Sequence, residues 1–252
     1  MLSAFDLTGR TALVTGANTG IGQAIAIALA EAGADIVVAG RTLAGETGAA
    51  VRAAGRAFFM VEADLAEAGR AGGVVKLALT HAPSIDVLVN NAGTIRRADA
   101  LDFTEADWDA VMDVNLKSVF FLSQAAAREM VRSGRGGKII NIASMLSFQG
   151  GIRVASYTAS KSGVAGLTKL LANEWAGKGI NVNAIAPGYV ATNNTAALRA
   201  DEKRNQDILA RIPAGRWATP SDIGGAAVFL ASAAADYVHG AVLPVDGGWL
   251  AR

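Results

Sequence analysis

TGANTGIG, the stretch from Thr15 to Gly22, joins a short apolar run to a segment with helical periodicity. Its glycines, Gly16, Gly20 and Gly22, have the spacing GxxxGxG. Glycine allows a tight turn and lets backbone N–H groups approach a pyrophosphate, which the positive end of the next helix stabilises. We therefore predict a strand, a phosphate-binding turn and a helix here, with a turn of purely steric role as the alternative.

The same alternation of strand and helix continues along the chain. Short β-branched runs recur without clean alternation of apolar and polar residues, as is typical of parallel strands covered on both faces. The runs are TALVTG (from Thr11), DIVVAG (Asp35), AFFMVEAD (Ala57), IDVLVNNAG (Ile85), KIINIAS (Lys138), INVNAIAPG (Ile180) and AVLPVDGG (Ala241). Between them lie helical segments, one of which has a capping box of Thr104 and Asp107 and is predicted to run through Leu116.

This pattern predicts an α/β fold. We expect a single Rossmann-type, doubly wound domain over residues 1–252, with a mainly parallel seven-stranded sheet flanked by helices. In such a fold, ligands bind at the carboxyl ends of the strands. Residues 191–214 depart from the alternation of strands and helices because they are polar and helix-prone, and we predict a substrate lid there. A surface excursion without function fits the pattern equally.

Composition excludes several kinds of chemistry. The chain has no cysteine, which removes thiolate nucleophiles and cysteine-ligated metals, and its two histidines, His81 and His239, form no HxH or HxxxH pair. We therefore predict no metal site. A net charge of +1 without a basic run argues against nucleic acid. We also expect a cytoplasmic protein without a membrane partner, because neither a signal-peptide core nor a run near the ~20 apolar residues of a membrane span is present.

The ends of the second and third predicted strands bear on the choice of dinucleotide. An NAD-binding fold commonly places an acid on the ribose 2′-hydroxyl at the end of the second strand. Here that place reads AGRT, so Arg41 is positioned to pair with a 2′-phosphate, a solvated arginine being the alternative. Asp64 and the NNAG loop (90–93) end the next two strands at the same edge, as ligand contacts or as turn formers. We predict NADP, with NAD as the second choice, although Thr19 stands where some NADP enzymes carry a second basic residue.

Tyr157 and Lys161, in YTASK, are four residues apart and so share one face of a helix. To lower the pKa of a tyrosine from ~10 to ~7, its surroundings must favour the phenolate by about 4 kcal/mol. A lysine charge ~6 Å away, at an effective dielectric constant near 20, supplies roughly 2.8 kcal/mol. Lysine alone therefore gives about two-thirds of the shift, and a positively charged nicotinamide ring would add more, whereas burial would oppose it. The alternative without a catalytic role is an amphipathic helix whose lysine extends its ammonium to solvent.

Two further polar residues strengthen the catalytic interpretation of Tyr157 and Lys161. Ser144 ends a predicted strand thirteen residues before Tyr157, where its hydroxyl could hold a substrate oxygen. Asn115 lies inside a predicted helix although asparagine is a poor residue for a helix interior. A kink, an amide that binds water near Lys161, or an exposed polar position would each explain that choice.

Taken together, these motifs resemble the classical short-chain dehydrogenases/reductases. TGANTGIG, NNAG, the asparagine of VNLK, Ser144, YTASK and APG (186–188) occur in that family's order and approximate spacing, over nearly the entire chain. The resemblance implies a catalytic tetrad of Asn115, Ser144, Tyr157 and Lys161 and, as a rule, a homotetramer. In it Tyr157 exchanges the proton, Ser144 orients the substrate oxygen, Lys161 binds the ribose and lowers the pKa of the tyrosine, and Asn115 anchors a relay water. With Arg41, the predicted cofactor-binding residues are Gly16, Asn18, Thr19, Gly20, Ile21, Gly22, Asp64, Leu65, Asn91, Ala92, Gly93, Tyr157, Lys161, Pro187, Gly188, Val190 and Thr192.

A narrower resemblance concerns the substrate. RADALDFTEADWDAVMDVNLKSVFFLSQAAA (97–127), RIPAGRW (211–217) and VDGGWLAR (245–252) are similar to a bacterial branch of the family that acts on 2-deoxy-D-gluconate or 2-dehydro-3-deoxy-D-gluconate. Members of that branch are associated mainly with NAD, whereas AGRT indicates NADP. A sugar acid needs a cation for its carboxylate, and we predict Arg153, four residues before Tyr157, with Arg96 of the pair Arg96–Arg97 nearby. Ser144 and Tyr157 complete the predicted substrate site.

The sequence thus predicts an NADP-preferring oxidoreductase that interconverts a secondary alcohol and a ketone on a deoxy sugar acid. Its partner is a small molecule, and the expected assembly is a homotetramer. One alternative is a 3-oxoacyl carrier-protein reductase, which should have an open, basic docking surface that the near-zero net charge does not favour. The other is a dinucleotide-binding regulator without turnover, against which the four occupied tetrad positions argue.

Overall fold

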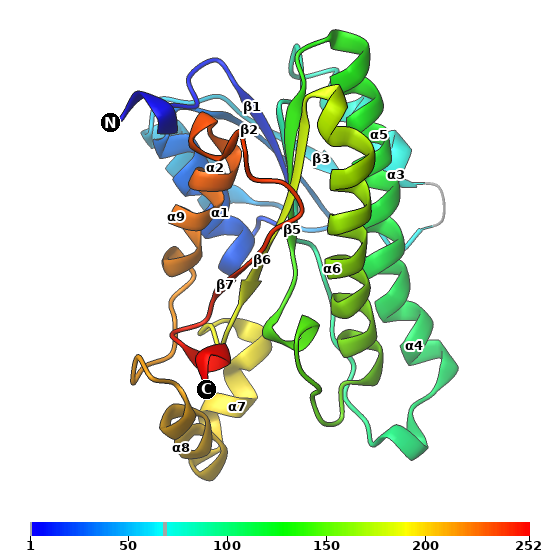
Figure 1. The fold of residues 1–252 in the computed structure, drawn as a ribbon, viewed down its shortest axis with the longest axis vertical. Helices are drawn as coiled ribbons and strands as arrows, with labels where there is room; N and C mark the ends of the chain where they lie inside the picture. Colours follow the sequence, from blue (N-terminus) through cyan, green and yellow to red (C-terminus); the bar gives the residue numbers. More distant parts are fainter. Residues whose placement is uncertain (1, 68–69) are drawn as a thin grey trace.

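Seven parallel strands form one sheet in the computed structural model, which describes residues 2–67 and 70–252 (Figure 1). They are β1 (Thr11–Thr15), β2 (Asp35–Gly40), β3 (Phe58–Glu62), β4 (Val87–Asn90), β5 (Gly137–Ile142), β6 (Ile180–Pro187) and β7 (Val242–Val245). The order is β3-β2-β1-β4-β5-β6-β7, and each neighbouring pair is parallel. The predicted fold class and the seven predicted strands are confirmed. Because the winding direction changes between β1 and β4, their carboxyl ends form the switch point at which such sheets bind ligands.

Helices cover both faces of the sheet. They are α1 (Gly20–Glu31), α2 (Gly45–Ala53), α3 (Arg70–Ala78), α4 (Glu105–Met112), α5 (Ser118–Ser133), α6 (Ala155–Trp175), α7 (Ala196–Ala200), α8 (Glu202–Arg211) and α9 (Ser221–Ala231). In Figure 1, α1, α2 and α9 lie on one side of the strands and α3, α5 and α6 on the other. Short 3-10 helices cover Ser3–Phe5, Ala100–Asp102, Met145–Ser147, Ala176–Lys178, Asn193–Thr195, Ala233–Ala235 and Trp249–Ala251.

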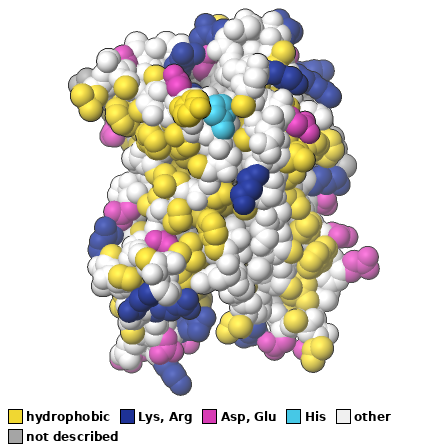
Figure 2. Space-filling view, viewed as in Figure 1, with side chains coloured by type: hydrophobic (Ala, Val, Ile, Leu, Met, Phe, Trp, Pro, Cys, Tyr) yellow, Lys and Arg dark blue, Asp and Glu magenta, His cyan; other side chains and the backbone are white. Residues whose placement is uncertain are grey.

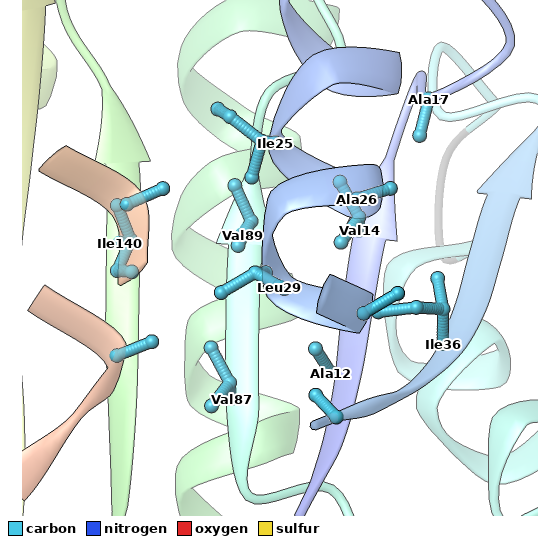
Figure 3. Packing of buried hydrophobic residues seen from close by; sticks show 14 of the residues in the cluster. Ala12, Val14, Ala17, Ile25, Ala26, Leu29, Ile36, Val87, Val89 and Ile140 are labelled. Carbon is cyan, nitrogen blue, oxygen red and sulfur yellow. The ribbon is translucent and has the colours of Figure 1, made fainter. Parts of the chain in front are cut away.

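Successive residues of each strand supply two separate cores. In β1, Ala12 and Val14 pack in the cluster with α1 and α9, whereas Leu13 packs in the cluster with α3 and α5. Figure 3 shows Ile25 and Leu29 of α1 lying over the strand residues of the first cluster. Both side chains are fully buried, and each such burial contributes about 1.5–3 kcal/mol. Because apolar side chains from helices cover both faces of the central strands, ligands are expected at the carboxyl ends of the strands.

Helices α4 and α5 form one continuous helix with an irregular turn between them. The Thr104 hydroxyl accepts the N–H of Asp107 at 3.2 Å, which confirms the predicted cap. The predicted helix continues to Ser133, but residues Asp113–Lys117 have π-helical hydrogen bonding. Asn115 lies in this wider turn, so a local distortion of the helix does occur at this position.

Residues 191–214 leave β6 at the carboxyl edge and include α7 and α8, which project beyond the sheet in Figure 1. Ile208 and Ile212 are buried in a small cluster with Met145, which follows Ser144, and Trp249 near the chain end. The segment therefore packs against the turn after β5 and the residues after β7, at the carboxyl edge of the sheet. Over the described ranges, none of the helices combines the length and apolarity needed to cross a bilayer.

Candidate active site

A cavity of about 710 Å³ lies at the carboxyl edge of the sheet. It brings together the turn after β1, the ends of β2, β3 and β4, helix α6 and the start of the segment after β6. The predicted site residues in its wall are Gly16, Asn18, Thr19, Gly20, Ile21, Gly22, Arg41, Asp64, Leu65, Asn91, Ala92, Gly93, Arg96, Tyr157, Lys161 and Thr192. The predicted residues Asn115, Ser144, Arg153, Pro187, Gly188 and Val190 lie outside this lining.

The glycine-rich turn is shaped both by packing and by the cavity. Gly16 and Gly20 have φ angles of 64° and 62°, which glycine adopts without strain. A Cβ atom on Gly22 would lie 2.3 Å from Asn91 Nδ2, so that glycine is required for space. The same amide nitrogen donates to the carbonyl oxygens of Thr15 (2.9 Å) and Gly16 (3.0 Å), which braces the turn against the loop after β4. Close backbone approach is therefore possible where α1 begins, as a pyrophosphate site needs.

Arg41 lies at the mouth of the cavity. Its side chain is 74% exposed, and its guanidinium is 3.6 Å from the carboxylate of Asp64. The second carboxylate oxygen of Asp64 accepts the N–H of Ala66 at 2.9 Å, which holds the acid in the wall. Three cations of the lining, Arg41, Arg96 and Lys161, outnumber its one acid. This balance favours an anionic ligand.

Helix α6 places Tyr157 and Lys161 side by side in the cavity wall. Lys161 Nζ lies 5.6 Å from the centroid of the Tyr157 ring, close to the separation assumed from the sequence. Lys161 is only 5% exposed and donates to the carbonyl oxygen of Ile142 at 2.6 Å. Burial lowers the pKa of Lys161 to about 8, so its ammonium is still mostly charged at neutral pH.

The surroundings of Tyr157 act in opposite directions. Burial raises the pKa of its phenol, while a hydrogen bond from Ser144 and the charge of Arg97 lower it. The net effect is a pKa above the ordinary value, so this tyrosine is neutral near pH 7. Additional positive charge is needed before its proton becomes easily transferable.

Ser144 is held where β5 ends. Its Oγ accepts the N–H of Leu146 at 3.1 Å, and the residue is 7% exposed. Because that oxygen already accepts a backbone hydrogen bond, its own hydrogen is free for donation to another oxygen. Ser144 is therefore oriented as a donor near Tyr157.

Asn115 is fully buried and its amide makes three hydrogen bonds. Oδ1 accepts the N–H of Thr94 at 2.8 Å, while Nδ2 donates to the carbonyl of Thr94 at 2.9 Å and to Ser160 Oγ at 3.3 Å. The explanation by an exposed polar position is thus wrong. Asn115 joins the loop after β4 to helix α6, next to the tyrosine and lysine.

The arginines predicted to meet a substrate carboxylate take different positions. Arg153 lies outside the cavity lining, is 61% exposed in its side chain and pairs with Asp99 at 3.3 Å. Arg96 lines the cavity and pairs with Asp107 at 3.2 Å. The neighbouring Arg97 donates to the carbonyl of Asn194 at 3.1 Å and acts on the pKa of Tyr157. From the sequence we predicted Arg96 of this pair as a substrate ligand, but we assigned no separate role to Arg97.

A doubly wound parallel sheet with a glycine-rich cradle at its switch point, and a serine, a tyrosine and a lysine beside it, defines a nucleotide-dependent oxidoreductase class. Residues 16–250 match a family profile described as enoyl-(acyl carrier protein) reductase. This chain belongs to the short-chain dehydrogenase/reductase family.

Full-length relatives are more specific than the description of the family profile. The chain is 61% identical over 252 residues to the 2-dehydro-3-deoxy-D-gluconate 5-dehydrogenase of Escherichia coli, with all of both chains covered. A solved structure from Agrobacterium tumefaciens, provisionally named 2-deoxy-D-gluconate 3-dehydrogenase and containing bound NADP, has 64% identity, a TM-score of 0.93 and 99% coverage of each chain. The 3-oxoacyl-[acyl-carrier-protein] reductase of Staphylococcus aureus is 40% identical, over 95% of this chain and 97% of that protein.

Proposed function

We propose that this protein is an NADP-preferring dehydrogenase that interconverts a secondary alcohol and a ketone on a deoxy sugar acid. The substrates that its relatives suggest are 2-dehydro-3-deoxy-D-gluconate and 2-deoxy-D-gluconate. The observation that carries the proposal is that Tyr157 and Lys161 line a cavity with a glycine-rich cradle, while Ser144 lies beside Tyr157. Catalysis requires these groups at one place, whereas a binding protein without turnover does not.

A nicotinamide dinucleotide fits the cavity residues. Gly16, Gly20 and the start of α1 would take the pyrophosphate, and Arg41 would pair with the 2′-phosphate that distinguishes NADP from NAD. Asp64 and Asn91 would line the adenosine and ribose side, together with the other predicted contacts. When bound, the cofactor supplies or accepts the hydride and adds positive charge in its oxidised form.

The protein's own residues handle the proton. Tyr157 would donate its proton to the substrate oxygen, or accept one from it, within hydrogen-bond reach. Ser144 would donate its free hydrogen to the same oxygen and hold it in place. The ammonium of Lys161 favours the phenolate of Tyr157, and Asn115 keeps the neighbouring loop and helix in register.

Arginines beside the loop after β4 would bind the substrate carboxylate. Arg97 is favoured because it donates to the carbonyl of Asn194, a residue of the cavity wall, and because its charge lowers the pKa of Tyr157. Arg153 reaches the substrate only if its pairing with Asp99 changes, and it remains our second candidate. The segment 191–214 would close over the substrate, since Asn194 contacts Arg97 and also lines the cavity.

A carrier-protein reductase is the nearest enzymatic alternative. Such an enzyme needs a basic surface beside its site for an acidic partner. Helix α8, at this edge, carries Lys203, Arg204 and Arg211 but also Glu202 and Asp207. Figure 2 accordingly shows acidic side chains among the basic ones in this region. The mixed charge of α8, and the 40% identity to a carrier-protein reductase against 61% to a sugar-acid dehydrogenase, make this alternative the weaker one.

We also propose a homotetramer in the cytoplasm. Phe121 and Val131 on α5 and Leu170 on α6 are nearly half exposed, which gives these helices apolar surface for an interface. Light scattering after size exclusion should give the mass of four chains, and a monomer mass would contradict the assembly.

The decisive experiment is a screen by nicotinamide absorbance. 2-Dehydro-3-deoxygluconate, 2-deoxygluconate, gluconate and an acetoacetyl thioester are each tested with NADP(H) and NAD(H). We expect turnover of a deoxy sugar acid, with a higher kcat/KM for NADP. Arg41→Gln should lower kcat/KM for NADP by about tenfold and leave that for NAD nearly unchanged. Turnover of the thioester alone would overturn the proposal.

A further inference from the structure

Ser147 lies between two residues that we assign to catalysis. It is the last residue of the short 3-10 helix Met145–Ser147, which begins directly after Ser144. Its hydroxyl donates to the carbonyl oxygen of Lys161 at 2.6 Å and accepts the N–H of Ser144 at 3.4 Å. One hydroxyl therefore joins the turn after β5 to helix α6.

The rest of this turn leaves Ser144 little freedom. The N–H of Ser147 donates to the carbonyl of Ser144 at 2.9 Å, and Ser144 Oγ accepts from Leu146 at 3.1 Å. The turn is thus closed on itself, and Ser147 fixes it to the backbone of α6. Ser162 makes a longer contact between the same helix and turn, from its Oγ to the carbonyl of Leu146 at 3.4 Å, and this hydrogen bond involves neither catalytic residue.

We propose that Ser147 is a positioning residue that sets the spacing between the Ser144 hydroxyl and the Tyr157–Lys161 pair; this rests on the function proposed above. Ser144 and the pair come from different elements, so their mutual geometry depends on what connects β5 to α6. The hydroxyl of Ser147 connects the two backbones by a single atom. Small misplacements of reacting groups lower rates by up to about 10².

The kinetic test compares Ser147→Ala with Ser147→Thr and Ser162→Ala. Ser147→Ala removes both hydrogen bonds, and we expect kcat to fall about tenfold or more while the Kd for NADP stays within about twofold. Ser147→Thr keeps the hydroxyl and should restore most of kcat. Ser162→Ala should behave as the unsubstituted protein.

A second readout does not depend on the substrate. The chain has three tyrosines, so ¹³Cζ-labelled tyrosine gives few resonances, and Tyr157→Phe assigns that of Tyr157. In the NADP-bound protein, Ser147→Ala should move the titration of Tyr157 to higher pH, since Ser144 no longer donates to it in the same geometry. If no sugar acid is turned over, the proposed function fails while this titration still decides the role of Ser147. An unchanged titration and kcat in Ser147→Ala, or an equal loss in Ser162→Ala, would overturn the role.

Discussion

At the scale of single residues, Tyr157 is subject to opposing influences. Lys161 Nζ lies 5.6 Å from the centroid of the tyrosine ring, and the groups that lower the pKa of the phenol are Ser144, through a hydrogen bond, and Arg97, through its charge. Burial nevertheless raises the pKa of the phenol. A buried tyrosine is protected from unproductive ionisation, and it becomes an effective acid or base only when further positive charge lies beside it.

Replacing this tyrosine should separate catalysis from binding. In Tyr157→Phe the ring remains, so we expect the Kd for NADP to change by less than about threefold. Loss of the proton-transferring hydroxyl should lower kcat by at least ~10². Fluorescence titration and steady-state kinetics measure the two quantities, and near-normal turnover would refute the assignment.

The two candidate carboxylate ligands predict different kinetics. We expect Arg97→Leu to raise KM for the sugar acid by about tenfold or more, because a charged hydrogen bond contributes about 1.5–3 kcal/mol. Arg153→Leu should have a similar effect only if Arg153 leaves Asp99 on binding. KM for NADPH serves as the control in both variants. An unchanged sugar-acid KM in Arg97→Leu together with a raised one in Arg153→Leu would return the role to Arg153.

These residues also show where prediction from sequence ends. Gly16, Tyr157 and Lys161 could be placed because their spacing within a strand, turn or helix determines their direction. The role of Arg97 depends on the path of the loop after NNAG, which no periodicity describes. The hydrogen bonds of Asn115 depend on Thr94, 21 residues earlier, and such contacts between elements are visible only in three dimensions.

At the scale of elements, Asp86 links three segments at the amino edge of the sheet. It lies just before β4 and is 3% exposed. It accepts hydrogen bonds from the N–H of Thr11 at the start of β1 (3.0 Å) and from Arg135 before β5 (2.9 Å). Burial alone would raise the pKa of Asp86, but these bonds and one from Ser84 outweigh it, so its pKa is lower than usual. A carboxylate with a lowered pKa stabilises the fold above its unfolded pKa and loses that effect as the pH falls.

Asp86→Asn should therefore destabilise the protein in a pH-dependent way. We expect the free energy of unfolding at pH ~7 to fall by about 2 kcal/mol, since charged hydrogen bonds are lost. Below pH ~4 the difference should shrink progressively, because the carboxylate of the unfolded chain is protonated first and that of the folded protein only at lower pH. Urea unfolding at several pH values measures both effects.

The control variant is Glu129→Gln, which removes an exposed pair with Arg132 and should change stability by less than about 1 kcal/mol. A constant difference across the pH range would contradict this account.

The π-helical turn between α4 and α5 illustrates the same limit for elements. The capping box of Thr104 and Asp107 predicts where the helix begins, because that signal is local. The wider turn at Asp113–Lys117 has no local signal apart from an asparagine in a helix interior. Asn115, in this turn, makes two hydrogen bonds with Thr94. The distortion therefore coincides with a contact between elements at the site, which the sequence of the helix alone does not encode.

At the scale of the whole molecule, the fold follows from features that the sequence repeats. Apolar runs without alternation predict strands covered on both faces, and the two clusters on either side of β1 have this arrangement. The strand order could not be read from any one run, because it depends on which helices cross which face. The close packing of α1 and α9, for example, brings together residues nearly two hundred positions apart and contributes to the core that fixes the order.

Stability of the whole molecule should also depend on the site lysine. The pKa of Lys161 is about 8 in the folded protein, whereas an unfolded lysine titrates near ~10.4. Between these values the unfolded chain binds more protons than the folded one, so the free energy of unfolding rises with pH. The full rise would be about 3 kcal/mol, although Tyr157, whose pKa is raised, opposes it above pH ~10.

Urea unfolding without cofactor between pH ~7.5 and ~9.5 tests this dependence, because most of the lysine effect and little of the tyrosine effect fall in that window. Lys161→Met removes the titrating group and should give a profile that is flat by comparison. Lys169→Met, on the exposed face of the same helix, should keep the wild-type rise. If all three proteins show the same slope, Lys161 is not buried as an ammonium. If only Lys161→Met loses the rise, the folded protein holds a costly charge at its site, where an anionic ligand would stabilise it.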